Sequence, residues 1–186
     1  VLNGESSKAA DRQTRQQAID EALAEIDQAY AQLPRVALRQ ELGQIRQDWQ
    51  ALASKVSQGA IKPGESLKAH TVLVNHLLNF VEDETGASGL ALDADMASYY
   101  LITAAFRDMP RMSEKMGLAR ARGTAMLVKR STDPDERSLL TTLVDGSQAH
   151  RNDLERSMAK AVAGNARVST ALRTPFEQAL AAHTRM

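Results

Sequence analysis

The chain has 186 residues, with 23 basic and 23 acidic side chains, so its zero formal charge gives no overall positive field that would favour nucleic acid. It contains no cysteine, which excludes disulfides and thiolate sites. No apolar run reaches the roughly 18 residues that a membrane-spanning helix needs, so these residues are not expected to contact a membrane themselves. The length is that of one domain, residues 1–186, or of two stacked sub-bundles.

The first part of the chain predicts long helices. Apolar residues recur at helical spacing from about Glu5 to Val56, with Pro34 interrupting the pattern. Because proline either kinks a helix or ends it, two helices or one kinked rod remain open. A break at residues 59–64 follows, and Pro63 is placed to start the next helix, over about 65–85, with Gly86 as its C-terminal cap.

The second part also predicts helices only. One runs from about Asp95 to Arg130 with a kink at Pro110, and Thr132 or Asp133 caps another that weakens at residues 164–165. A last amphipathic segment covers about 167–186 and holds Leu172, Phe176 and Leu180. No segment alternates with the period of a strand. The predicted fold is all-α: an elongated antiparallel helical bundle of four long kinked helices, or about six helices in two stacked bundles.

Residues that would carry chemistry are sparse. Among the four histidines, His70 and His76 are the closest in sequence, yet their spacing puts them on different helix faces, so we expect no metal site. The sequence has no phosphate loop, nucleophile motif or acid–base pair, which predicts a protein that is not an enzyme and has no cofactor. The methionines of the third long helix are expected to fill a core (Met96, Met109, Met112, Met116 and Met126).

Polar residues interrupt one seam of that helix. The seam steps by three and four residues through Tyr99, Thr103, Phe106, Pro110, Ser113, Gly117, Arg120, Thr124 and Leu127. If Arg120 is buried, an acid of the protein or a ligand carboxylate must pair with it; otherwise it lies at the edge of the face and reaches water. Arg107 and Arg111 are expected on a solvated face.

One segment resembles a known family. Residues 92–101, Leu-Asp-Ala-Asp-Met-Ala-Ser-Tyr-Tyr-Leu, resemble the Leu-Asp-Pro-Asp-Leu-Asp-Ser-Tyr-Tyr-Leu-Met-Asp motif in the periplasmic sensor regions of bacterial methyl-accepting chemotaxis receptors. The similarity extends from about Trp49 to Gly123, including a Met-Pro pair at 109–110 and a Gly-x-x-Arg-x-x-Gly pattern at 117–123. Ala94 and Ala97 replace a proline and an aspartate of the motif, and Ile102-Thr103 replaces its Met-Asp, so no role of either lost carboxylate is carried over.

The motif also has a physical interpretation. Asp93 or Asp95 can cap the helix that follows. Tyr99 and Tyr100 lie about 100° apart on a helix, so only one of them can enter a given seam. The other would face a partner helix, a second subunit or water.

The resemblance implies a periplasmic ligand-binding domain of an inner-membrane chemoreceptor. Such a domain works as a homodimer, has membrane-spanning helices on both sides in the full-length protein, and signals by a helix displacement. The expected ligand is a small molecule, an organic acid among the options, held by Tyr99, Thr103, Arg107, Arg120 and His70. The family's domains usually continue past the position of Met186, so part of the natural domain is expected beyond it. A sensor of a histidine kinase or diguanylate cyclase, and a non-sensory structural or adaptor bundle, remain alternatives.

Overall fold

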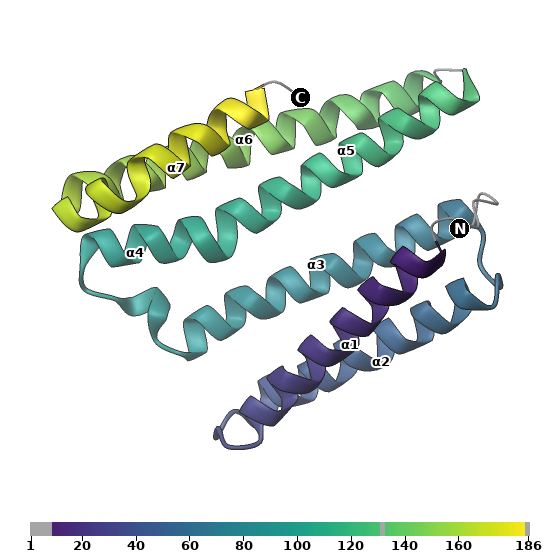
Figure 1. Cartoon of the computed structure of the whole chain (residues 1–186), viewed down its shortest axis with the longest axis horizontal. Coiled ribbons are helices and arrows are strands. Elements are labelled where there is room, and N and C mark those ends of the chain that lie inside the picture. Colours follow the sequence, from purple (N-terminus) through teal and green to yellow (C-terminus); the bar gives the residue numbers. More distant parts are fainter. Residues whose placement is uncertain (1–8, 131–132, 185–186) are drawn as a thin grey trace. The chain divides into compact units, whose positions relative to one another are not determined.

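The protein is all-helical. The computed structural model describes residues 9–130 and 133–184, except for six side chains near the C-terminus. Glu5, Thr132 and the side chain of Leu180, which entered the predictions above, lie outside that description. Over the described residues the helices are α1 (Ala9–Tyr30), α2 (Val36–Ser57), α3 (Pro63–Ala87), α4 (Met96–Thr103), α5 (Met109–Lys129), α6 (Pro134–Gly164) and α7 (Ala166–Thr184), with no strand (Figure 1). The all-α prediction is confirmed.

The chain divides into two compact units, Val1–Glu84 and Thr85–Met186. The first unit holds α1, α2 and α3, and the second holds α4 to α7. In the described part of the chain, no helix is both long enough and apolar enough to cross a bilayer.

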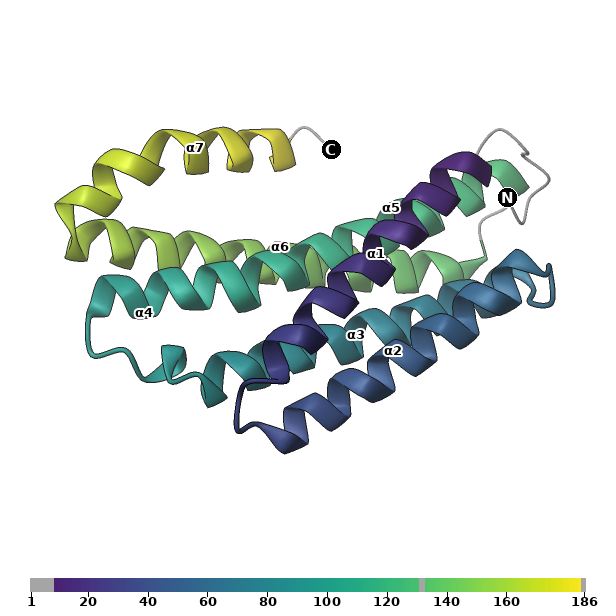
Figure 2. The same ribbon diagram turned by 60° about the horizontal axis from the view of Figure 1, so that its bottom comes forward.

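In the first unit, Pro34 ends a helix rather than kinking it. α1 stops at Tyr30, the chain turns, and α2 runs back along α1 from Val36 (Figure 2). A buried cluster joins the three helices: Leu23, Tyr30, Leu42, Ile45 and Phe80, with Leu38, Trp49 and Leu73 against it. The sequence therefore folds this region as two helices of a three-helix unit, and the alternative of one long rod is wrong.

In the second unit, α4 and α5 are joined without a break by a π-helical segment, η3 (Ala104–Asp108). Pro110 has no N–H, and its ring would clash with the Phe106 carbonyl four residues earlier in a regular α-helix. The wider turn that precedes Pro110 is closed instead by a bond from the Met109 amide to the Ala104 carbonyl. The predicted kink at Pro110 is thus a π-helical turn, and Figure 1 shows the helix changing direction there.

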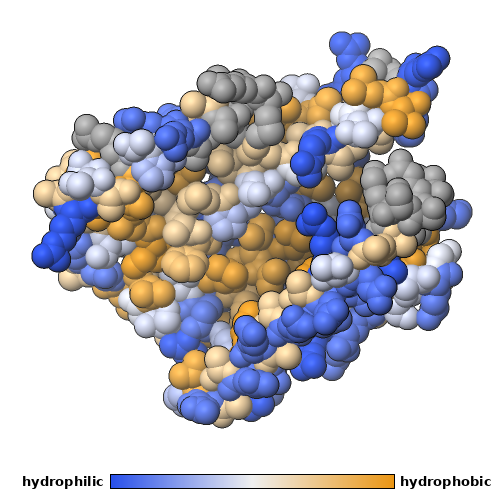
Figure 3. Space-filling view, viewed as in Figure 1, coloured by the Kyte–Doolittle hydropathy of each residue, from blue (hydrophilic) through white to orange (hydrophobic). Residues whose placement is uncertain are grey.

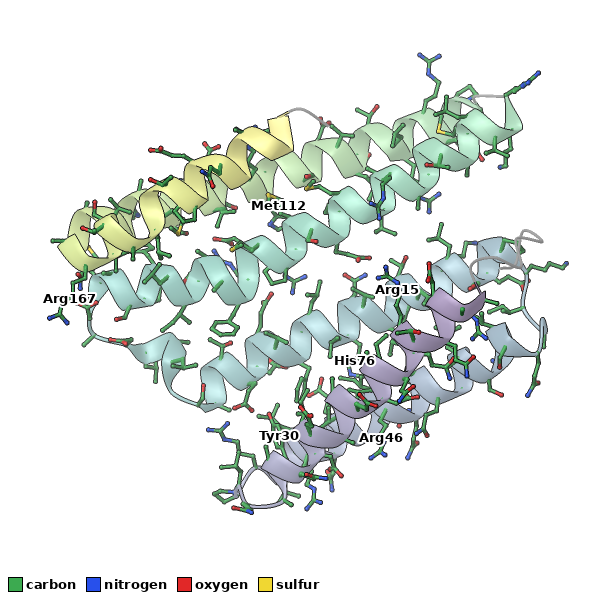
Figure 4. The ribbon with its side chains drawn as sticks, in the orientation of Figure 1. Arg15, Tyr30, Arg46, His76, Met112 and Arg167 are labelled. Atoms are coloured by element: carbon green, nitrogen blue, oxygen red, sulfur yellow. The ribbon has the colours of Figure 1, made fainter. Side chains whose placement is uncertain are left out.

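The core of the second unit lies between α4–α5, α6 and α7. Ala104, Leu154 and Met158 are buried, and Leu101, Met112, Leu172 and Phe176 pack on them. Met112, labelled in Figure 4, belongs to this core, and Met126 is also buried. Met96 and Met109 are 53% and 46% exposed, so the prediction that they fill a core is wrong.

Candidate functional site

The segment that resembles the receptor motif forms a helix start. The Asp95 carboxylate accepts a hydrogen bond from the Ser98 amide at 2.8 Å, and Asp93 accepts one from the Asp95 amide at 2.8 Å. Hydrogen bonds from the backbone and the side chain of Ser98 lower the pKa of the Asp95 carboxyl. The predicted capping role is confirmed, and it uses both acids of the segment.

The first turn of α4 also packs against the junction between α6 and α7. A β-carbon added at Gly164, the last residue of α6, would lie 3.1 Å from the Met96 methyl and 3.4 Å from the Ala97 β-carbon. Asn165 then starts α7, with its side-chain oxygen accepting a hydrogen bond from the Arg167 amide at 2.9 Å. The motif therefore fixes the place where the chain enters its last helix.

The two tyrosines face different surroundings, as their spacing predicts. Tyr99 is 40% exposed, whereas Tyr100 is half-buried. The rings meet edge to face with centroids 5.1 Å apart, and Lys160 on α6 donates to the Tyr100 hydroxyl at 2.9 Å. Tyr100 thus holds α4 to α6, and Tyr99 is the tyrosine that remains open to a ligand or partner.

A buried carboxylate lies at the π-helical turn. Asp108 is only 1% exposed; it accepts hydrogen bonds from the Ser157 hydroxyl at 3.2 Å and from Arg107 Nε at 2.9 Å. Arg107, one of the predicted ligand residues, is therefore already engaged by an acid of the protein. The sequence analysis missed Asp108 because the wider π turn changes which residues of this helix face inward.

Arg120 is exposed, so the alternative in which it reaches water holds. Thr103 is half-buried at the end of α4, directly before the π turn. Arg107 and Arg120 are 13 positions apart, which separates their backbones by about 20 Å along the helix, so one small ligand would contact one of these arginines rather than both. These three residues and Tyr99 belong to the second unit, whereas His70 belongs to the first.

His70 lies in a polar part of the first unit. Its ring Nδ1 is 2.7 Å from the backbone carbonyl of Ser66 and 3.3 Å from the Ser66 hydroxyl. Because a carbonyl oxygen only accepts, Nδ1 carries the proton and donates it there. Ser66 is buried, and its hydroxyl can donate its own proton to another acceptor.

Contacts along the helices set the register of the first unit. Trp49 Nε1 on α2 donates to Asp20 on α1 at 2.8 Å, and His76 on α3 is 3.2 Å from Glu41 on α2. The Tyr30 hydroxyl donates to Glu84, which pairs the ends of the parallel helices α1 and α3.

The start of α1, the end of α2 and the start of α3 lie at one end of the unit in both views (Figures 1 and 2). Arg12 and Gln16 lie near the start of α1, and Ser66 and His70 lie near the start of α3. Contacts between α1 and α3 are found at the opposite end, where the Tyr30 ring meets Phe80 and the Tyr30 hydroxyl meets Glu84.

Near the start of α1, Arg12 has a hydrogen-bond donor without an acceptor. Arg12 donates from one terminal nitrogen to the Gln16 side-chain oxygen at 3.0 Å. Its Nε is buried and has no hydrogen-bond partner, which singles it out among the side-chain nitrogens and oxygens of the described residues. The Gln16 amide group and the Ser66 hydroxyl retain protons to donate. The acids next in sequence, Asp11 and Glu65, are exposed.

The Arg12 side chain is therefore suited to an anion. A buried guanidinium N–H without an acceptor carries a desolvation cost that an oxyanion would remove. Among the described residues no cluster of histidines and acids could hold a metal ion.

These features place the described chain among all-helical domains built from packed amphipathic helices. A family model described as nitrate and nitrite sensing matches residues 1–185, and the chain belongs to that family. It is thus an extracytoplasmic sensor domain of a signalling protein. No curated protein and no solved structure matched significantly.

Proposed function

We propose that this sensor domain detects nitrate or nitrite in the periplasm. The observation that carries the proposal is the match to the nitrate and nitrite sensing family over almost the whole chain. The surplus of donors around Arg12 supports it, because these ligands are small oxyanions that only accept hydrogen bonds.

The output that we propose is chemotaxis. The motif at residues 92–101 resembles that of methyl-accepting chemotaxis receptors, and its acids and Tyr100 occupy structural positions in this chain. Such a receptor would be a homodimer in the inner membrane. Its ligand would act by favouring one of two helix arrangements, which requires different affinities for the two. Kinase or cyclase output is the alternative, and the sequence that follows the domain in its gene distinguishes the three.

Calorimetric titration of the purified domain tests the ligand. Sodium nitrate and sodium nitrite are compared with sodium chloride at equal ionic strength and with a dicarboxylic acid. At a nitrate concentration of about 100 times Kd, binding to the folded state alone adds about 2.7 kcal/mol to the free energy of unfolding. That corresponds to a rise in Tm of roughly 5–11 °C for a domain of this size. Binding of the organic acid without nitrate or nitrite would contradict the proposal.

A further inference from the structure

Ionisable side chains take part in holding α3 to the rest of the first unit. His76, Phe80 and Glu84 follow one another at four-residue spacing, so they lie on one face of α3. Phe80 is buried, and its ring centroid is 5.9 Å from that of Tyr30 on α1. On one side of Phe80, Glu84 accepts from the Tyr30 hydroxyl. On the other side, His76 Nε2 is 3.2 Å from the Glu41 carboxylate on α2.

We infer that the contact between His76 and Glu41 makes the attachment of α3 to α2 sensitive to pH, and that protonation of His76 tightens it. Histidine is the side chain whose ordinary titration falls between about pH 5 and pH 8. A protonated imidazole donates a charge-assisted hydrogen bond to a carboxylate, which is roughly twice as strong as a neutral one. The inference goes beyond the proposed nitrate response and does not depend on it.

The surroundings of the pair favour such a response. The side chains of His76 and Glu41 are 33% and 29% exposed, so water and salt screen their interaction less than that of a fully exposed pair. Apolar contacts hold the helices together beside the pair, since Phe80 belongs to the buried cluster and Leu73 packs against it. The imidazole of His76, labelled in Figure 4, is therefore held near its acid by packing that does not titrate.

The other charged groups of this region are engaged with one another. Glu84, two turns further along α3, pairs with Arg35. Burial raises the pKa of the Tyr30 hydroxyl most, the Arg35 charge lowers it and the Glu41 charge raises it, so this α1 side chain lies within electrostatic reach of both. With a pKa above 10.0, Tyr30 stays protonated below pH 8. Further charges between α1 and α2 also pair: Asp27 with Arg39 and Arg46.

The position of α3 in the chain gives the contact a consequence outside the first unit. α3 spans Pro63–Ala87, and the second unit begins at Thr85, so this helix is the covalent connection between the two units. A proton taken up by His76 would therefore act on the element through which the first unit reaches the second.

The test is thermal unfolding of the whole domain at about pH 5.5 and about pH 8, the range in which histidine titrates. Wild type is compared with His76→Gln, Glu41→Gln and the double variant, because glutamine forms hydrogen bonds but gains no charge. We expect His76→Gln to lower the Tm by about 1–3 °C more at the acidic pH than at the alkaline one. In the Glu41→Gln background this additional loss should disappear, and the comparison cancels the titration of all other groups.

Amide hydrogen exchange shows where the effect lies. Wild type and His76→Gln are compared at each pH, so the intrinsic pH dependence of exchange cancels. Residues 71–84 should lose about two- to tenfold more protection at the acidic pH. An equal Tm loss at both pH values would overturn the inference. So would an acid-specific loss that remains in the Glu41→Gln background, because the proton would then act through another partner. Neither result bears on nitrate, which is absent from these measurements.

Discussion

Gly164 lies so close to Ala97 that a β-carbon on Gly164 would come within 3.4 Å of the Ala97 β-carbon. The contact joins the motif at the start of α4 to the last residue of α6. Ala97 is 1% exposed, and its side chain is a single methyl group that cannot rotate away from added atoms. The exposed Met96 methyl, also near Gly164, can move aside.

We expect Gly164→Leu to lower the free energy of unfolding by about 1–3 kcal/mol, because the added atoms overfill this junction. Gly123→Leu is the control: a β-carbon there meets nothing within 4 Å, and leucine favours a helix over glycine by somewhat less than about 1 kcal/mol. Urea denaturation measures both. Equal effects of the two substitutions would show that the junction is not closely packed.

The second prediction concerns the buried carboxylate at the π turn. Ser157→Ala removes the hydroxyl that donates to Asp108 and should lower the free energy of unfolding by about 1–3 kcal/mol. Ser138→Ala, at an exposed position of the same helix, should change it by less than about 0.5 kcal/mol. Chemical denaturation of both variants checks the difference, and a Ser157→Ala variant as stable as the wild type would contradict it.

The helices could be predicted from the sequence, but which of their faces are buried could not. Breaks at Pro34, Pro63 and Gly164 are local effects of proline and glycine, and each appears as a helix end in the structure. Gly86 was expected to cap α3, but the helix continues to Ala87 and the left-handed conformation falls on Gly89. The helix end thus differs by two residues from the prediction, which is a typical uncertainty for a helix terminus.

The candidate site was harder to predict because it depends on which side-chain atoms become buried. Arg12 drew no attention in the sequence, since it is a common polar residue on an amphipathic helix. Only the folded structure shows that its Nε is buried without a hydrogen-bond partner. Asp108 was missed for a related reason, because the π turn shifts the inward face in a way that α-helical spacing does not describe.

The third prediction concerns Arg120, one of the ligand residues expected from the sequence. Arg120→Ala should leave nitrate affinity unchanged within about twofold, because the Arg120 side chain is exposed and water screens its interaction with a small anion. Its Tm should also stay close to that of the wild type. Calorimetry with nitrate and with a dicarboxylic acid decides: loss of organic-acid binding in Arg120→Ala would restore the seam of α5 as the ligand site.

The fourth prediction concerns the pairing of α1 with α3. Tyr30→Phe and Glu84→Gln should each lower the free energy of unfolding by roughly 1–2 kcal/mol, since the first removes the donor of a partly buried hydrogen bond and the second replaces its charged acceptor with a weaker neutral one. The double variant should lose less than the two added together, with a coupling of about 0.5–3 kcal/mol. Additive losses would mean that the two side chains act independently.

Tyr30 also gives this pairing a dependence on alkaline pH. Burial is the main cause that raises the pKa of the Tyr30 hydroxyl above its ordinary value of 10.0. A raised folded-state pKa means that the stabilisation is fully present below the unfolded value and is lost as pH rises through the folded one. Wild-type stability should therefore fall above about pH 10 more steeply than that of Tyr30→Phe. Parallel slopes of stability against pH would contradict this.

The last prediction concerns Glu114 on α5. Burial raises the pKa of the Glu114 carboxyl, and Lys115 only partly opposes the effect. Because the folded-state pKa lies above the unfolded value, the contribution of Glu114 to stability is present below the unfolded value and is lost as pH rises through the folded one. Glu114→Gln should consequently be more stable than the wild type at pH 7 and lose that advantage below about pH 4.5. Urea denaturation at both pH values tests this against Glu25→Gln, an exposed position on α1. A gain in Glu114→Gln that persists unchanged at the acidic pH would have to come from a source other than the charge.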